Sequence, residues 1–150
     1  MLFLKALFAF LVLPGIVAFA VPLFLLKPAD TTPFWPGALI VGAGTALLVR
    51  CVREFYVAGR GTLAPWSPPK QLVTSGPYRW SRNPMYIGVL LILVGWAVGF
   101  RSRGLGVYAA IVAIAFHVRV LVAEEPWQSR TFGEDWNNYK SAVPRWLGPL

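Results

Sequence analysis

The stretch that decides the fold is LGVYAAIVAIAFHVRVLVA at residues 105–123, which runs directly into the acidic pair Glu124-Glu125. Its titratable side chains, His117 and Arg119, both stand near its carboxyl end. A helix needs about 20 predominantly apolar residues to cross the hydrocarbon core of a bilayer. The stretch therefore predicts a membrane-spanning helix that ends at two carboxylates.

The composition of the whole chain agrees with a membrane protein. Of its 150 residues, 57% are hydrophobic and 13% are charged, and the mean hydropathy is +0.59. An ordinary soluble domain carries about 25% charged residues, and one domain of this length cannot bury so much apolar surface. Disordered chains are polar and poor in aromatic residues, whereas 15% of this chain is aromatic. The composition argues against both a soluble globular domain and a disordered chain.

Three further apolar segments precede the one at residues 105–123. They cover about residues 2–26, 35–52 and 85–100, and the last of them is short for a full span. The pattern predicts an all-α fold: a multi-pass membrane bundle of about four transmembrane helices, formed by a single domain over residues 1–150.

The first apolar segment also resembles a signal peptide. Lys5 is followed by an apolar run and by Ala18-Phe19-Ala20, which has small residues at 18 and 20 as at a cleavage site. The run continues to Leu26, so cleavage would leave an apolar stub, and we favour a retained helix. We expect Pro14 and Pro22 to kink it, because proline cannot donate the helical hydrogen bond.

Small residues recur at spacings of four in two of the predicted spans. Ala38, Gly42 and Ala46 share one face of the second span, and Gly95 and Gly99 form a G-x-x-x-G in the third. Such faces let helix backbones approach closely in lipid. The alternative is that Gly and Ala are simply common in membrane helices, and the oligomeric state stays open because the same faces serve internal packing or a dimer.

Cations are distributed unequally between the two sides of a four-span arrangement. The positive-inside rule then places both termini and the 50–84 segment in the cytoplasm. The net charge of +8 is accordingly a signal of topology, and we expect no nucleic-acid partner. The other side holds Lys27, Arg101 and Arg103, against eleven on the cytoplasmic side: Lys5, Arg50, Arg53, Arg60, Lys70, Arg79, Arg82, Arg119, Arg130, Lys140 and Arg145.

The linker between the second and third spans is unsuited to a long helix. Residues 58–84 are rich in Gly, Pro and Ser, which predicts an irregular cytoplasmic segment. Its aromatic residues Trp66, Tyr78 and Trp80 suit the membrane–water interface.

The polar tail over residues 124–139 predicts a C-terminal cytoplasmic helix. Phe132, Trp136 and Tyr139 recur at the spacing of one helical face. We expect this stripe to pack against the linker or the lipid surface rather than to form a ligand site.

Metal-binding residue types are scarce. Cys51 is the only cysteine and His117 the only histidine, so we expect no intrachain disulfide and no metal site. His117 stands two helical turns before Glu124, on about the same face, whereas Arg119 should point elsewhere. His117 is therefore either functional or a hydrogen-bonded structural group.

The acidic pair is the clearest functional candidate. Adjacent helical residues differ by about 100°, so one of Glu124 and Glu125 can face the bundle while the other faces water. An ionisable residue within a membrane bundle is a functional hypothesis by default. The alternative for Glu124 is an ion pair with Arg82 or Arg79 that tethers the tail.

The segment TSGPYRWSRNPMYIG at residues 74–88 completes a longer pattern. Together with the acidic pair and FGEDWNNYKSAVPR at residues 132–145, it resembles the isoprenylcysteine carboxyl methyltransferase and phospholipid methyltransferase superfamily. The resemblance covers about residues 59–150 and implies a small multi-pass enzyme that uses S-adenosylmethionine. The family usually has His where Asn83 stands, and Asn cannot titrate. A catalytic Arg of the eukaryotic prenylcysteine enzymes falls on Val120, which argues against a prenylcysteine carboxylate substrate.

Two sets of site residues follow. For catalysis we single out Glu124 and His117, as candidate bases, and Arg82, which either meets the cofactor carboxylate or neutralises Glu124. The cofactor-binding residues that the resemblance implies are Lys70, Gln71, Leu72, Val73, Tyr78, Asn83, Pro84, Met85, Tyr86 and Glu124.

The sequence thus favours methyl transfer from S-adenosylmethionine to a lipophilic acceptor in the membrane, either isoprenylcysteine-carboxylate-like or phospholipid-like. One alternative is an NADPH-dependent sterol or isoprenoid reductase, which has a similar motif but more spans. The other is a non-catalytic scaffold or small transporter, which should carry a charge near mid-membrane in an early span.

Overall fold

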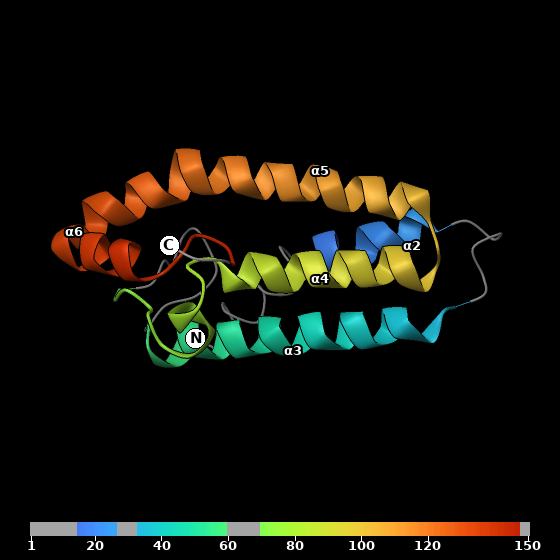
Figure 1. The fold of residues 1–150 in the computed structure, drawn as a ribbon, viewed down its shortest axis with the longest axis horizontal. Helices are drawn as coiled ribbons and strands as arrows, with labels where there is room; N and C mark the ends of the chain where they lie inside the picture. Colours follow the sequence, from blue (N-terminus) through green and yellow to red (C-terminus); the bar gives the residue numbers. More distant parts are fainter. Residues whose placement is uncertain (1–14, 27–32, 60–69, 148–150) are drawn as a thin grey trace.

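The described part of the chain is helical. The structure, a computed structural model, describes residues 15–26, 33–59 and 70–147, and every regular element in them is a helix (Figure 1). This confirms the predicted all-α fold. In chain order the elements are η1 (Ile16–Ala20, π-helical), α2 (Val21–Leu25), α3 (Trp35–Val57), η3 (Gly76–Arg79, 3₁₀), α4 (Pro84–Gly99), α5 (Arg103–Arg119), η4 (Val120–Glu124, π-helical) and α6 (Glu125–Ala142).

Two of these helices are long and apolar enough to cross a membrane. They are α3 and the continuous helix from Arg103 to Ala142, which joins α5, η4 and α6. The apolar helices Ile16–Leu25 and α4 are shorter; α4 is about 24 Å long at 1.5 Å per residue. The protein is a membrane helix bundle, while the number of spans stays a prediction, and the part of the first predicted span before residue 15 lies outside the described residues.

Helix α4 lies between α3 and α5 (Figure 1), and its contact with α3 is very close. A Cβ placed on Gly37 would lie 2.2 Å from the Gly99 Cα, and one on Gly95 would lie 2.7 Å from the Val41 backbone nitrogen. Only glycine allows such an approach of two backbones. The predicted packing role of Gly95 and Gly99 is confirmed.

The small-residue face predicted on the second span does not pack against α4. Ala38, Gly42 and Ala46 are exposed, and a Cβ on Gly42 would meet nothing within 4 Å. The face that meets α4 carries Gly37 and Gly44 instead. Both faces of α3 carry small residues, so spacing alone did not distinguish them.

Each π-helical turn ends two residues before a proline: η1 before Pro22 and η4 before Pro126. Proline lacks the N–H that an α-helix needs and crowds the carbonyl four residues earlier, and local π geometry relieves such a defect in membrane helices. The distortion expected at Pro22 takes this form, while Pro14 lies outside the described residues.

The predicted C-terminal helix is confirmed as α6, but it does not simply extend away from the bundle. Gly133 has φ 51° and ψ −118°, which interrupts the helix. The second half folds back over residues 70–83, at the end of the bundle where α3 ends and α4 begins (Figure 1). The linker and the acidic pair therefore meet at one end of the molecule.

Candidate functional site

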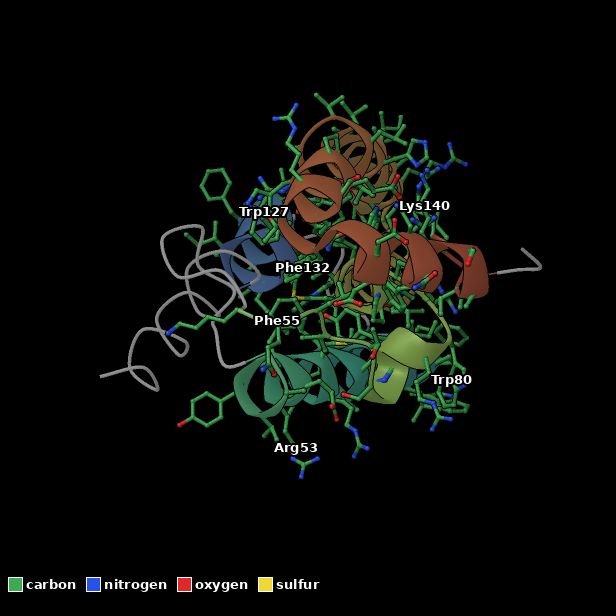
Figure 2. The ribbon with its side chains drawn as sticks, turned by 90° about the vertical axis from the view of Figure 1, so that its left-hand side faces the viewer. Arg53, Phe55, Trp80, Trp127, Phe132 and Lys140 are labelled. Atoms are coloured by element: carbon green, nitrogen blue, oxygen red, sulfur yellow. The ribbon has the colours of Figure 1, made fainter. Side chains whose placement is uncertain are left out.

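A small hollow lies at this end, between the end of α3, residues 71–82 and α6. Figure 2 looks onto this end of the bundle, with Phe55 and Phe132 approaching from α3 and α6. The hollow is shallow, with about 300 Å³ of empty space when its open mouth is included. Its walls are Phe55, Gln71, Leu72, Val73, Tyr78, Arg82, Gln128, Phe132 and Tyr139.

Two residues of the hollow carry buried polar atoms without a hydrogen-bond partner. The Tyr78 hydroxyl and the Arg82 Nε have no oxygen or nitrogen partner within the described residues, and the polar neighbour of the Tyr78 hydroxyl is the Cys51 thiol. Tyr78 is 5% exposed, and burial raises the pKa of its hydroxyl well above the ordinary value, so it stays protonated as a donor. Buried polar groups are nearly always paired, so two unpaired ones beside a hollow suit a polar ligand. Tyr78 is therefore not the interfacial aromatic that we expected, whereas Trp80 is exposed.

Tyr139 fixes the hollow from the α6 side. Its hydroxyl donates to the Tyr78 backbone carbonyl at 2.7 Å, and burial raises the pKa of this hydroxyl. The apolar cluster of Trp136, Tyr139 and Val143 packs against Leu72. The tail stripe thus packs against the linker, as expected, and it also lines the hollow, which we had not expected.

The second carboxylate of the acidic pair holds the tail in place. Arg82 Nη1 donates to Glu125 Oε1 at 3.0 Å, and Arg145 Nε donates to the same oxygen at 2.7 Å. Burial acts to raise the pKa of the Glu125 carboxyl, but the hydrogen bonds from Arg145 and the charge of Arg82 outweigh it and hold that pKa below its ordinary value. Arg82 therefore neutralises Glu125, and the alternative that it neutralises Glu124 is wrong.

Asn83 has a structural partner. Its Nδ2 donates to the Arg145 carbonyl at 3.0 Å, and the Ser81 hydroxyl donates to the same carbonyl at 3.2 Å. The Arg82 backbone N–H donates to the Pro144 carbonyl at 2.9 Å. An amide that cannot titrate suits this docking of the C-terminal segment, because its donor is present at any pH.

The first carboxylate forms a separate cluster with two residues. Glu124 accepts from the Tyr86 hydroxyl and, at 2.9 Å, from Arg119 Nε, which also donates to the Tyr86 oxygen at 3.1 Å. The expectation that Arg119 points elsewhere is wrong, as is the proposed pairing of Glu124 with Arg82 or Arg79. The π-helical turn η4 lies between Arg119 and Glu124 and brings residues five apart onto one face.

The expected proximity of His117 to Glu124 is also changed by η4. His117 is exposed, and its Nδ1 accepts from Trp146 Nε1 at 3.2 Å. The wider π turn rotates Glu124 away from the position that an α-helix would give it. The structure thus pairs His117 with the C-terminal segment.

The sequence-predicted cofactor residues divide into groups. Gln71, Leu72, Val73 and Tyr78 line the hollow with Arg82, and Tyr86 lies with Glu124. Lys70 is exposed, Pro84 is buried at the start of α4, and Met85 packs between two apolar clusters.

Sequence reasoning missed several residues of this region. It passed over Phe55 and Gln128 in the hollow and Glu54 behind it. The signals were weak: Glu54 is a single acid near the end of a span. Among residues 15–26, 33–59 and 70–147, no group of three potential metal ligands occurs.

The fold and site define a helical membrane protein with a partly polar hollow at the helix ends, beside two arginine-neutralised carboxylates. The family model described as phospholipid methyltransferase matches residues 33–135, and the chain belongs to this family. Two curated relatives are named protein-S-isoprenylcysteine O-methyltransferase: that of Mus musculus is 36% identical and that of Rattus norvegicus 29%. Each alignment covers 126 residues, 76% of this chain and 44% of the relative.

The chain therefore spans less than half the length of these relatives. No solved structure matches it significantly. The family resemblance inferred from residues 59–150 is confirmed: the chain belongs to the phospholipid methyltransferase family and is similar to two isoprenylcysteine O-methyltransferases.

Proposed function

We propose that the protein transfers a methyl group from S-adenosylmethionine to a lipophilic acceptor dissolved in the bilayer. The observation that carries the proposal is the hollow with two unsatisfied polar atoms, Tyr78 Oη and Arg82 Nε. A family of methyltransferases needs a methyl donor, and a buried donor hydroxyl and guanidinium beside apolar walls suit a ligand that is partly apolar and partly anionic.

The residues of the hollow fit this cofactor in chemical type. Leu72 and Phe132 offer apolar surface for a flat base, and the amides of Gln71 and Gln128 offer donors and acceptors for its edge. Arg82 offers a free Nε to a carboxylate while its Nη1 stays on Glu125. The bound cofactor supplies an electrophilic methyl group.

The protein's own part in the reaction is alignment and charge. Holding two reactants in line removes about 7–11 kcal/mol of barrier without covalent help. A carboxylate acceptor needs no base, whereas an amine acceptor must lose a proton, for which Glu124 is the candidate base. Tyr86 and Arg119 hold that carboxylate in place. His117 is a second candidate: its basic atom is Nδ1, which accepts from Trp146 Nε1, so that hydrogen bond must break before His117 can take a proton.

The proposed membrane arrangement has four spans, with the hollow and both termini on the cytoplasmic side of a bacterial inner membrane. The meeting of residues 70–83 with α6 at one end of the bundle supports it, as does the excess of cations on those segments. The acceptor then enters sideways from the bilayer, and the cofactor enters from water.

The test uses the purified chain in detergent and, in parallel, membranes that contain it. We expect methyl-labelled S-adenosylmethionine to bind saturably, NADPH not to compete, and label to appear in a lipid-soluble product. Competition by NADPH would favour the reductase alternative. Binding of neither nucleotide, with no labelled product, would refute the proposal and favour a scaffold or transporter.

A further inference from the structure

Glu54 is a buried carboxylate that the proposed reaction does not use. It lies three residues before the end of α3 and is 9% exposed. Burying a carboxylate is costly unless hydrogen bonds or opposite charges compensate it. Its charged partner is Arg50, at 3.8 Å and with a side chain 58% exposed, and an exposed pair of this kind contributes little. The compensation must come mainly from elsewhere.

It comes from the turn that precedes Tyr78. The Ser75 hydroxyl donates to Glu54 Oε2 at 2.6 Å. The backbone of Gly76 lies against the same side chain, because a Cβ there would be 2.8 Å from Glu54 Cδ and 2.9 Å from Oε1. Gly76 also has φ +59°, a region that residues with a Cβ rarely adopt. The turn is thus shaped to sit directly on the carboxylate.

This contact fixes two walls of the hollow. The Tyr78 N–H donates to the Ser75 carbonyl at 3.2 Å, so the position of Ser75 sets the start of η3 and the placement of the Tyr78 ring. Phe55, the residue after Glu54, packs its ring 5.5 Å from that of Tyr78. Both rings line the hollow.

We infer that Glu54 is a positioning residue for the cofactor: through Ser75 and Gly76 it holds Tyr78 against Phe55 in the geometry that binds S-adenosylmethionine. The inference rests on the proposed function for its ligand. Glu54 touches neither the hollow nor the reacting atoms. Its loss should therefore weaken cofactor binding and leave the chemical step nearly unchanged.

The experiment compares Glu54→Ala, Glu54→Gln and Ser75→Ala with the matched control Arg50→Ala, by equilibrium binding of labelled S-adenosylmethionine and by methyl transfer. Glu54→Ala should raise Kd on the order of tenfold, the effect expected from losing one hydrogen bond to a charged group. Its kcat at saturating cofactor should stay within about threefold. Glu54→Gln keeps an acceptor for Ser75 and should restore most of the affinity, while Arg50→Ala should bind as the unmodified protein does.

A second measurement needs no cofactor. Cys51 is the only cysteine of the chain, is 0% exposed and packs in one cluster with Tyr78. Release of the turn should speed alkylation of Cys51 by N-ethylmaleimide in Glu54→Ala and Ser75→Ala, and leave it unchanged in Arg50→Ala.

The outcomes separate the two claims. Suppose that the variants are alkylated faster but the unmodified protein does not bind S-adenosylmethionine. That result would refute the proposed function and the cofactor role of Glu54, and would support only the contact between Glu54 and the turn at Ser75 and Gly76. Unchanged alkylation and unchanged Kd in Ser75→Ala would overturn the positioning role, even if Glu54→Ala fails to fold. Equal losses in kcat and affinity would overturn it too.

Discussion

We expect removal of the Tyr78 hydroxyl to raise the stability of the ligand-free protein and to weaken cofactor binding. Tyr78→Phe removes a buried hydroxyl that has no oxygen or nitrogen partner in the described residues and whose polar neighbour is the weakly hydrogen-bonding Cys51 thiol. An unsatisfied buried polar group costs about 1–3 kcal/mol, so the ligand-free variant should be more stable by up to that amount. For a chain of this size, each kcal/mol is about 2–4 °C in Tm.

Binding should change the other way. If the hydroxyl donates to S-adenosylmethionine, its loss removes a hydrogen bond with a net value of about 0.5–1.5 kcal/mol. Because 1.36 kcal/mol corresponds to a factor of ten, Kd should rise by about 2- to 13-fold. The matched control is Tyr139→Phe, which deletes a hydroxyl that donates to the Tyr78 carbonyl at 2.7 Å. This variant should lose about 1–3 kcal/mol, because a buried carbonyl is left unpaired.

The assay is thermal unfolding in detergent, with and without S-adenosylmethionine, beside equilibrium binding of the labelled cofactor. The stabilisation that the cofactor confers should be smaller for Tyr78→Phe than for the unmodified protein. A fall in the ligand-free Tm as large as that of Tyr139→Phe would show that the Tyr78 hydroxyl already has a partner. The reasoning from an unsatisfied donor would then be refuted.

Three further predictions concern packing, the tail and the acidic pair. Gly37→Ala should destabilise by about 1–3 kcal/mol through overpacking, whereas Gly42→Ala, which meets nothing, should stabilise by about 0.4–1 kcal/mol; equal Tm shifts would contradict the observed α3–α4 contact. Hydrogen bonds from Arg145 lower the pKa of the Glu125 carboxyl in the folded state. The stability that ionised Glu125 contributes is therefore fully present above the ordinary pKa of a glutamate, and it is lost as pH falls through the lowered pKa. Proteolysis of the C-terminal segment should therefore increase on acidification, and Glu125→Gln should abolish that pH dependence or the assignment fails. Glu124→Ala should abolish or strongly weaken binding of S-adenosylmethionine in calorimetry, and binding within about a factor of two of the unmodified protein would remove Glu124 from the site.

Much of the fold was predictable because composition and apolar length leave few choices in a membrane. The runs at residues 35–52, 85–100 and 105–123 correspond to α3, α4 and α5 with η4. The irregular course of residues 70–83 and the tail helix followed from proline content and polarity, respectively, while residues 60–69 of the predicted linker lie outside the described residues. These features depend on local properties of the chain, which the sequence states directly.

Which face of each helix meets its neighbour was less predictable. Gly37 and Gly44, not Ala38 and Gly42, approach α4, because the choice depends on the rotation of a packed partner. The buried Glu54 was missed for a related reason. Its partner Ser75 is 21 residues away in the chain, and no local pattern records that contact.

The roles of the candidate site residues stay predictions. The family resemblance implied Gln71, Leu72, Val73 and Tyr78 as cofactor residues, Arg82 was a catalytic candidate, and all five line the hollow. The pairing of carboxylates with arginines was wrong because it assumed a regular α-helix through residues 119–125. Pro126 was the one available signal of the π turn there.

That π turn has a consequence for which changes in length the helix can tolerate. A π turn amounts to one extra residue within an α-helix, so it sets the rotation of everything after it by about 100°. The lipid-facing surface of α5 and the orientation of Glu124 are therefore fixed by different parts of the same helix. Removal of one residue from 120–124 would keep the hydrophobic length almost intact and yet swing both acids, with the whole tail, around the helix axis.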